Sequence, residues 1–180
     1  MDILGLAADS IATLDEYPEM PDVEEDGDTF LANAIKKAEA AAAYTGEIAM
    51  ADDSGLEVDA LNGQPGVYSA RFAGEPSDDA KNNAKLLALL TNVPAEKRTG
   101  RFRCVIAVAE PDGRVETADG TCEGRIAFVE AGNGGFGYDP LFIPDGFERS
   151  FGELTPETKH RISHRGKALA AVRPILDRML

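Results

Sequence analysis

The stretch that decides the fold runs from residue 101 to residue 125 and reads RFRCVIAVAEPDGRVETADGTCEGR. Two segments with a strand-like pattern, 102–109 and 115–122, flank Pro111-Asp112-Gly113. Because Pro, Asp and Gly in succession favour a tight turn between two strands, this pattern predicts a β-hairpin. The remaining elements are therefore expected to pack around a sheet that contains this hairpin.

Helices and strands alternate loosely on both sides of the hairpin. Further strands are predicted at residues 2–6, 48–51, 126–130 and 141–143, and helices at residues 28–44, 77–90 and 163–180. Asp28 or Thr29 is expected to cap the first helix and Ser77 the second, and Pro174 is expected to interrupt the third. Because helices accompany an antiparallel hairpin, the predicted fold is α/β with a mixed sheet.

The length and composition favour one well-buried domain, expected to span residues 1–180. Of the 180 residues 43% are hydrophobic, and no composition break divides the chain. No apolar run is long enough for a transmembrane helix, and the first residues lack the pattern of a secretory signal. Two cysteines, Cys104 and Cys122, are too few for a disulfide framework or a four-ligand zinc site. A soluble, cytoplasmic protein with no membrane partner is expected.

The charge is unevenly distributed. The net charge is −14, and residues 1–35 hold ten acidic and no basic residues. This distribution argues against a general nucleic-acid binder, which presents a basic face. The exception is a cluster of cationic side chains within nine residues: Lys159, His160, Arg161, His164, Arg165 and Lys167. Such a cluster suits one small anion, or it is a solvated helix face.

Two acidic motifs are candidates for chemistry. Asp52-Asp53 follows an apolar run, and Asp52 through Gly55 has the composition of a turn. Because successive strand residues point to opposite faces, one carboxylate of the pair can face a cleft while its neighbour hydrogen-bonds into the frame. Such a carboxylate can hold Mg²⁺ or take a proton from water; the alternative is a turn or cap aspartate. Glu24-Glu25-Asp26 is either a source of a further metal ligand or a solvated triplet.

The segment from Gly134 to Pro140 combines glycines, two aromatic residues and an acid. Glycine lets the backbone approach a ligand closely, and Phe136 or Tyr138 can stack on a flat base. The alternative is a glycine-rich turn whose aromatic side chains fill the core. Arg165 offers a planar fork of donors for a carbonyl or phosphate, and His164 donates from a ring nitrogen. Together these motifs suggest a ligand with a flat base, several phosphates and a divalent ion, although no Walker loop is present.

Five motifs in order carry a resemblance to a known family. They are Asp28-Thr29-Phe30-Leu31-Ala32-Asn33-Ala34 with Lys37, Ala51-Asp52-Asp53-Ser54-Gly55-Leu56, Pro65-Gly66-Val67-Tyr68-Ser69-Ala70-Arg71, Gly134 through Pro140, and Ser163-His164-Arg165-Gly166-Lys167. Across about residues 2–178 the chain resembles the inosine triphosphate pyrophosphatases, also called non-canonical purine nucleoside triphosphate pyrophosphatases.

The resemblance implies a long mixed sheet flanked by helices, two lobes with a central cleft, and a homodimer. It also implies Mg²⁺-dependent hydrolysis of ITP, XTP or their deoxy forms to the monophosphate and pyrophosphate, which cleanses the nucleotide pool. Asp53 would be the proton acceptor and a Mg²⁺ ligand, with Glu25 as a second ligand. The substrate would be bound by Lys37 and Ser54 at the phosphates, by Phe136, Gly137, Tyr138 and Asp139 around the base and sugar, and by Lys159, His164 and Arg165 at the base.

The chain departs from the family pattern at two points. Family members open with a strand that carries Thr/Ser-x-Asn-x-x-Lys, whereas residues 1–4 align with the second strand, so the domain is expected to be short at its N-terminus. Ala32 stands where the family usually has Glu or Asp, which should weaken metal binding. These departures motivate an alternative, a nucleotide-binding protein of the same fold with impaired turnover. A third interpretation, an interaction module, is supported only by the acidic first segment.

Overall fold

The structure is a computed structural model that describes residues 10–180. Its central feature is a sheet of four strands in the order β1-β2-β3-β4, each pair antiparallel. The strands are β1 (Ala49–Val58), β2 (Thr99–Ala109), β3 (Val115–Ile126) and β4 (Phe142–Pro144). The parallel pairing that a mixed sheet requires does not occur among the described strands, and the strand predicted for residues 2–6 lies outside the described residues.

The predicted hairpin is confirmed as β2 and β3. Ala109 pairs with Val115 at its closed end, and the turn is held by Gly113 N–H, which donates to the carbonyl of Glu110 at 3.0 Å. Gly113 has φ +92°, a conformation that favours glycine. The turn chemistry is local, so the sequence alone specifies it.

Four α-helices and four short 3₁₀ helices surround the sheet in the described part of the chain. The α-helices are α1 (Phe30–Thr45), α2 (Asp79–Leu89), α3 (Pro156–Ile162) and α4 (His164–Met179). The 3₁₀ helices are η2 (Leu14–Glu16), η3 (Asp59–Leu61), η4 (Gly66–Arg71) and η5 (Ala95–Lys97). None of these helices is long and apolar enough to cross a membrane.

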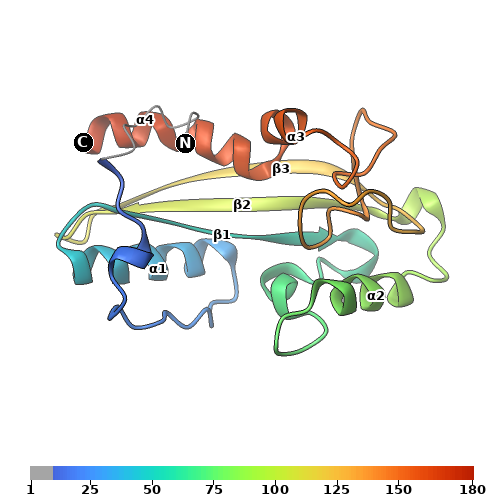
Figure 1. The fold of residues 1–180 in the computed structure, drawn as a ribbon, viewed down its shortest axis with the longest axis horizontal. Coiled ribbons are helices and arrows are strands. Elements are labelled where there is room, and N and C mark those ends of the chain that lie inside the picture. Colours follow the sequence, from blue (N-terminus) through green and yellow to red (C-terminus); the bar gives the residue numbers. More distant parts are fainter. Residues whose placement is uncertain (1–9) are drawn as a thin grey trace.

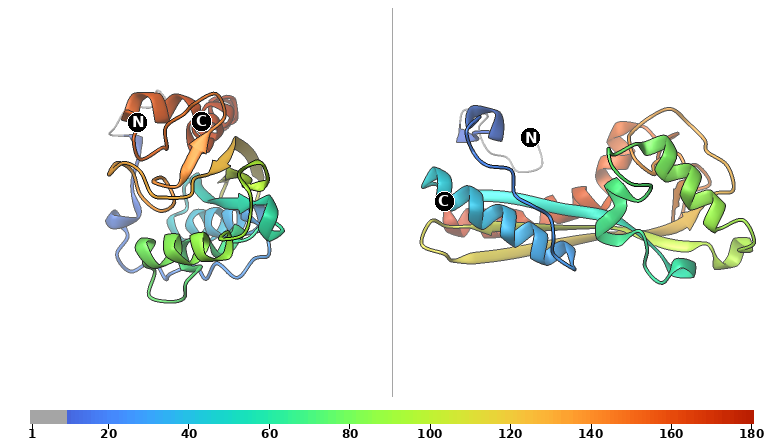
Figure 2. Two further views of the ribbon diagram at one scale, coloured as in Figure 1. Left: turned by 90° about the vertical axis from the view of Figure 1, so that its right-hand side faces the viewer. Right: turned by 90° about the horizontal axis from the view of Figure 1, so that it is seen from below.

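The elements form three layers and two lobes. In one lobe α4 covers one face of the sheet and α1 covers the other (Figure 1). Side chains of β2 alternate between these two layers: Ile106 packs with α4, whereas Val105 packs with α1. In the other lobe the ends of the strands pack against α2, β4 and the long loop that follows β3 (Figure 2). The α/β fold with two lobes and a central cleft is therefore confirmed.

Strand β1 corrects the sequence prediction at the point that matters most for function. The prediction ended the strand before Asp52 and made Asp52 through Gly55 a turn, but the strand continues unbroken to Val58. Asp52, Asp53 and Ser54 pair in register with apolar residues of β2, and these pairings override the local preference for a turn. A side chain at Gly55 would collide with Ser69 and Gly66, so glycine lets η4 lie against the strand.

Smaller corrections concern helix and strand ends. Thr29 caps α1 as predicted, but α2 is capped by Asp78 rather than Ser77. No strand follows Ile126 over residues 127–130, and helix α3 was not predicted. Helix α4 runs through Pro174 without a break, because apolar side chains on both sides of it pack on the sheet; Ala170, whose carbonyl the proline leaves without its helical hydrogen bond, is an exposed residue.

Candidate functional site

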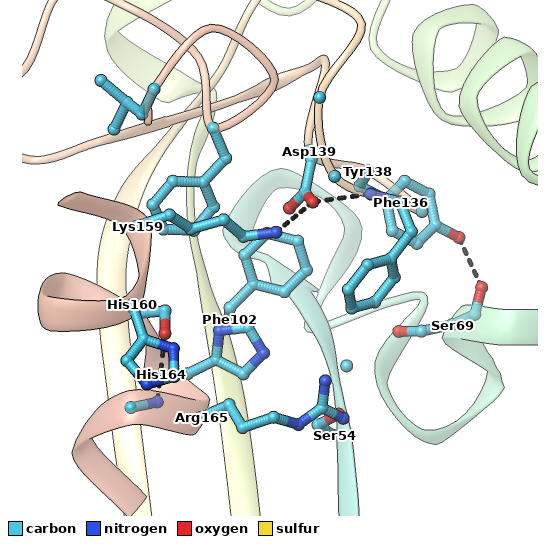
Figure 3. A pocket seen from close by; sticks show the side chains of 18 of the residues that line it. Ser54, Ser69, Phe102, Phe136, Tyr138, Asp139, Lys159, His160, His164 and Arg165 are labelled. Atoms are coloured by element: carbon cyan, nitrogen blue, oxygen red, sulfur yellow. Dashed lines mark hydrogen bonds and ion pairs between the residues drawn. The ribbon is translucent and has the colours of Figure 1, made fainter. Parts of the chain in front are cut away.

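A cavity of about 580 Å³ is lined by side chains from both lobes; Figure 3 shows many of them from close by. Its walls come from the middle of β1, from β2, from the loop after β3, and from α3 and the first turn of α4. Eight of the residues predicted to bind substrate line it: Ser54, Phe136, Gly137, Tyr138, Asp139, Lys159, His164 and Arg165. The structure thus brings together the two motifs that lie farthest along the chain.

Two closely packed helices deliver the cationic side chains. Ser163 ends α3 and caps α4, accepting from Gly166 N–H at 3.1 Å. A side chain at Gly166 would overlap the carbonyl oxygen of His160, and one at Gly120 on β3 would overlap that of His164. These two glycines let the first turn of α4 lie directly on the sheet. This close packing places Lys159, from α3, and Arg165, from α4, at the cavity.

The glycine-rich loop forms a tight turn that Asp139 closes. The Asp139 carboxylate accepts from Phe136 N–H at 2.8 Å and forms an ion pair with Lys159. The turn presents the Phe136 ring, which is 65% exposed, to the Lys159 amine at 4.8 Å and to the Arg165 guanidinium at 6.0 Å (Figure 3). An exposed aromatic ring opposite cationic donors is suited to a flat ligand. Tyr138, by contrast, is buried, and its hydroxyl donates to the Ser69 carbonyl at 2.8 Å.

His164 forms part of the cavity floor and stays uncharged near neutral pH. Its ring stacks on Phe102, with centroids 4.7 Å apart. Burial lowers the pKa of His164 to about 3, and the neighbouring charge of Arg165 acts in the same direction. The Nδ1 atom is buried and has no hydrogen-bond partner within residues 10–180. A ligand in the cavity can therefore supply the partner of this nitrogen.

The two aspartates of β1 point to opposite faces of the sheet. On the α4 face, Asp52 Oδ2 accepts from Arg165 Nη2 at 2.8 Å, and the same nitrogen lies 3.2 Å from Ser54 Oγ. On the α1 face, Asp53 Oδ2 accepts from Asn33 Nδ2 at 2.9 Å. Asp53 therefore does not line the cavity, although its neighbour Ser54 does. Among the described strands β1 is one of the two edge strands, so the Asp52 face and the Asp53 face meet along its outer edge.

The pKa of Asp53 is raised above the ordinary value of an aspartate. Burial is the main cause that raises its pKa, and the charge of Glu25 adds to this effect; the hydrogen bond from Asn33 and the charge of Lys37 oppose it. Lys37 forms an ion pair with Glu25 at 2.5 Å, and Arg71 Nη2 donates to the Glu25 carbonyl at 2.9 Å. Asp53, Glu25 and Lys37 thus form a second cluster, on the α1 face.

The second cluster fits a divalent cation in its donor chemistry. Within the described residues no group of three or more His, Cys, Asp and Glu side chains is placed to hold a metal ion. The two carboxylates of Asp53 and Glu25 nevertheless provide hard oxygen ligands, and Mg²⁺ is commonly held by one or two carboxylates together with substrate phosphates. The raised pKa of Asp53 indicates that further positive charge would be stabilising there.

The sequence missed several residues of the site. Phe102, Phe151, Ser69 and Asp79 line the cavity, and Asn33 holds Asp53. Asn33 lies in a motif that carried the resemblance, so its position on α1 was a usable signal. Ser69 also lies in one of those motifs. Phe102 on β2, Phe151 in a loop and Asp79 on α2 lie at the cavity because of contacts distant in sequence.

Comparisons with known proteins agree with this geometry. Residues 2–175 match the model of the Ham1 family. A dITP/XTP pyrophosphatase of Desulforamulus reducens is 62% identical over 169 residues, which cover 94% of this chain and 84% of the relative.

Two solved structures are also similar. The Ham1 protein of Staphylococcus aureus superposes with a TM-score of 0.86 at 44% identity, covering 93% of this chain and 86% of that one. The dITP/XTP pyrophosphatase of Mycobacterium abscessus superposes with a TM-score of 0.79 at 48% identity, covering 92% and 84%. With a family match over nearly its whole length and relatives this similar, the chain belongs to the Ham1 family.

Proposed function

We propose that this protein is a pyrophosphatase that hydrolyses non-canonical purine nucleoside triphosphates such as dITP, XTP and ITP. The products are the nucleoside monophosphate and pyrophosphate. One observation carries the proposal: Arg165, in the cavity suited to a base, hydrogen-bonds to Ser54, the residue that follows Asp53 along β1. The two halves of the site are thus adjacent, and one nucleotide can occupy both. The relatives named dITP/XTP pyrophosphatase support the same substrate class.

The cavity side accounts for base selection. Lys159 and Arg165 present cationic donors beside the Phe136 ring, and neutral His164 offers a ring N–H. A purine with a carbonyl at C6 accepts from such donors, whereas the C6 amino group of adenine is itself a donor and cannot pair with Lys159 or Arg165. A site built from such donors disfavours the wrong group because the donors are left unpaired.

The α1 face accounts for the reaction. Water attacks the α-phosphorus, the bond from that phosphorus to the oxygen bridging to the β-phosphate breaks, and pyrophosphate leaves. We assign Asp53 as the acceptor of the proton lost by water, because its raised pKa makes it a stronger base than a surface aspartate. Lys37 and Ser54 contact the phosphates. Asp53 and Glu25 would hold Mg²⁺, which when bound neutralises phosphate charge.

The experiment measures pyrophosphate release from dITP, XTP, ITP and ATP, each with Mg²⁺ and with EDTA. With Mg²⁺ we expect turnover in the ordinary enzyme range, about 1–10³ s⁻¹, for the first three, and a kcat/KM for ATP lower by at least about 100-fold. Release of orthophosphate, or equal use of ATP, would contradict the proposal. Binding of ITP without turnover would instead support the alternative of an impaired nucleotide-binding protein, which Ala32, exposed in the first turn of α1, motivates.

The proposal includes a cytoplasmic location, because the triphosphate pool is there, and a homodimer, as the family resemblance implies. The oligomeric state is measured directly by light scattering on the purified protein, and a monomer would contradict the second part.

A further inference from the structure

Helix α2 contacts both walls of the cavity, although no motif within residues 79–89 indicates a functional role for it. Asn82 donates to the Ala70 carbonyl at 2.9 Å and accepts from Ala73 N–H at 2.7 Å. Lys85 donates to the Phe72 carbonyl at 2.5 Å. These bonds hold the segment 70–73, which directly follows Ser69 at the cavity wall.

The same helix also holds the opposite wall, through Gly137. The Gly137 N–H donates to Asp79 Oδ2 at 2.7 Å, and the Gly137 carbonyl accepts from Asn83 Nδ2 at 3.1 Å. Asp79 and Asn83 are four residues apart, so they lie one above the other on one helix face. One face of α2 therefore satisfies both backbone polar groups of a single loop residue.

The backbone at Gly137 determines where the neighbouring side chains of the loop lie. It has φ +59°, so its conformation is one that most residues avoid. It lies between Phe136, which faces the cationic side chains, and Tyr138, which is bonded to Ser69. A shift of the Gly137 peptide would move the Phe136 ring relative to Lys159 and Arg165.

Helix α2 is itself held in place by buried contacts within its lobe. Its C-terminal end is held by the buried Arg98, whose guanidinium donates to the carbonyl oxygens of Leu90, Val93 and Ala127 at 2.7, 3.0 and 2.9 Å. Leu86 and Leu90 are fully buried in the adjoining core. The core of this lobe thus holds α2 in place. Because both walls of the cavity are bonded to α2, the helix sets the distance between them.

We propose that Asp79 and Asn83 are positioning residues that hold the Gly137 peptide and thereby set the distance of Phe136 from Arg165 before substrate binds. They act through the loop and not on the reacting atoms. This inference rests on the proposed function only for its kinetic part. When the two side chains are removed, the loop is no longer held by α2, and substrate binding must then also order it.

The structural test uses a fluorescent reporter. The chain contains no tryptophan, so Phe136→Trp introduces a single indole whose fluorescence anisotropy reports the loop alone. We expect the anisotropy to fall when Asp79→Ala and Asn83→Ala are added to this reporter protein. Lys81→Ala, on the exposed side of the same helix, is the matched control and should leave the anisotropy unchanged.

The kinetic test uses the chain with Phe136 intact. We expect Asp79→Ala with Asn83→Ala to raise the KM for ITP about 10-fold or more, from the loss of two hydrogen bonds, while kcat stays within about threefold. Asp79→Asn removes the charge but keeps an acceptor oxygen, so it should restore most of the KM. A KM that rises equally in Asp79→Asn would show that charge, not positioning, is responsible, and would overturn the proposal.

An unchanged anisotropy together with an unchanged KM would also overturn it. If the double variant does not fold, Asp79→Ala alone, at an exposed position, gives the same two measurements. The anisotropy result does not depend on turnover. A wild-type chain that fails to hydrolyse ITP would therefore refute the proposed function while the loop test still decides this inference.

Discussion

The two faces of β1 at Asp52–Ser54 differ in how completely their charges are paired. On the cavity face, Asp52 pairs with Arg165 and Asp139 pairs with Lys159. On the α1 face, Asp53 accepts hydrogen bonds from Asn33 Nδ2 and from Ser54 N–H but has no ion pair within the described residues, and its pKa is raised. The comparison suggests that the cavity is formed before the nucleotide binds, whereas the α1 face is completed by phosphate and a cation.

The largest expected effect comes from Asp53→Asn, which keeps the size of the side chain but cannot take up a proton. We expect turnover of ITP to fall by about 10²–10⁴-fold, the usual contribution of a general base, while the ITP dissociation constant changes little. Rapid-quench kinetics and calorimetry measure the two quantities. Near-normal turnover would show that the reaction half of the site lies elsewhere.

Arg165→Ala tests the cavity face. Because Arg165 is assigned to the base, the ratio of kcat/KM for ITP to that for ATP should fall by about 10–100-fold. Competition kinetics with both nucleotides measures this ratio. If the ratio is unchanged and only kcat falls, Arg165 serves the phosphates, and the division between the two faces is wrong.

Asp52→Asn is the matched partner of Asp53→Asn, since the same change is made one residue away on the other face. It removes the charge that holds Arg165 at 2.8 Å, so we expect KM for ITP to rise about 3- to 10-fold with kcat unchanged. A loss of kcat as large as that of Asp53→Asn would remove the distinction between the faces.

The expected effect of His164 is on stability and not on activity: it makes the free energy of unfolding depend on pH. Its pKa is lowered to about 3 in the folded protein, whereas in the unfolded chain it is about 6.5. Between these values the unfolded state binds the extra proton, so stability is lost as pH falls below about 6.5. From pH 7 to pH 5 this loss amounts to at most about 2 kcal/mol.

Urea unfolding at both pH values measures the effect. His164→Phe, which keeps a ring against Phe102, should lack this part of the pH dependence. The exposed His160→Gln is the control and should retain it. An identical pH dependence in wild type and His164→Phe would mean that His164 is not buried as a neutral ring.

The sequence predicted what local chemistry decides. The Pro111-Asp112-Gly113 turn and the Thr29 cap follow from short-range preferences, and both are confirmed. Asp52-Asp53 was misread as a turn, because only pairing with β2 reveals that the strand continues. The roles assigned from the family motifs remain predictions, although the structure gathers eight of those residues around one cavity.

Contacts between segments that are distant in sequence could not be predicted from the sequence. Asp79 and Asn83 meet Gly137 across 58 and 54 positions, and nothing in the spacing of helix α2 indicates a partner. The neutrality of His164 depends on burial by Phe102 and by the close approach of α4 to Gly120. Both features depend on tertiary packing, which cannot be read from a single sequence.

The central claim is that one nucleotide spans both faces of β1 over its edge. The crystal structure of Asp53→Asn with ITP and Mg²⁺ tests it most directly. We predict the base in the cavity beside Phe136 and His164, and the α-phosphate within contact distance of residue 53. A base bound outside that cavity, or a triphosphate that leads away from residue 53, would contradict the account.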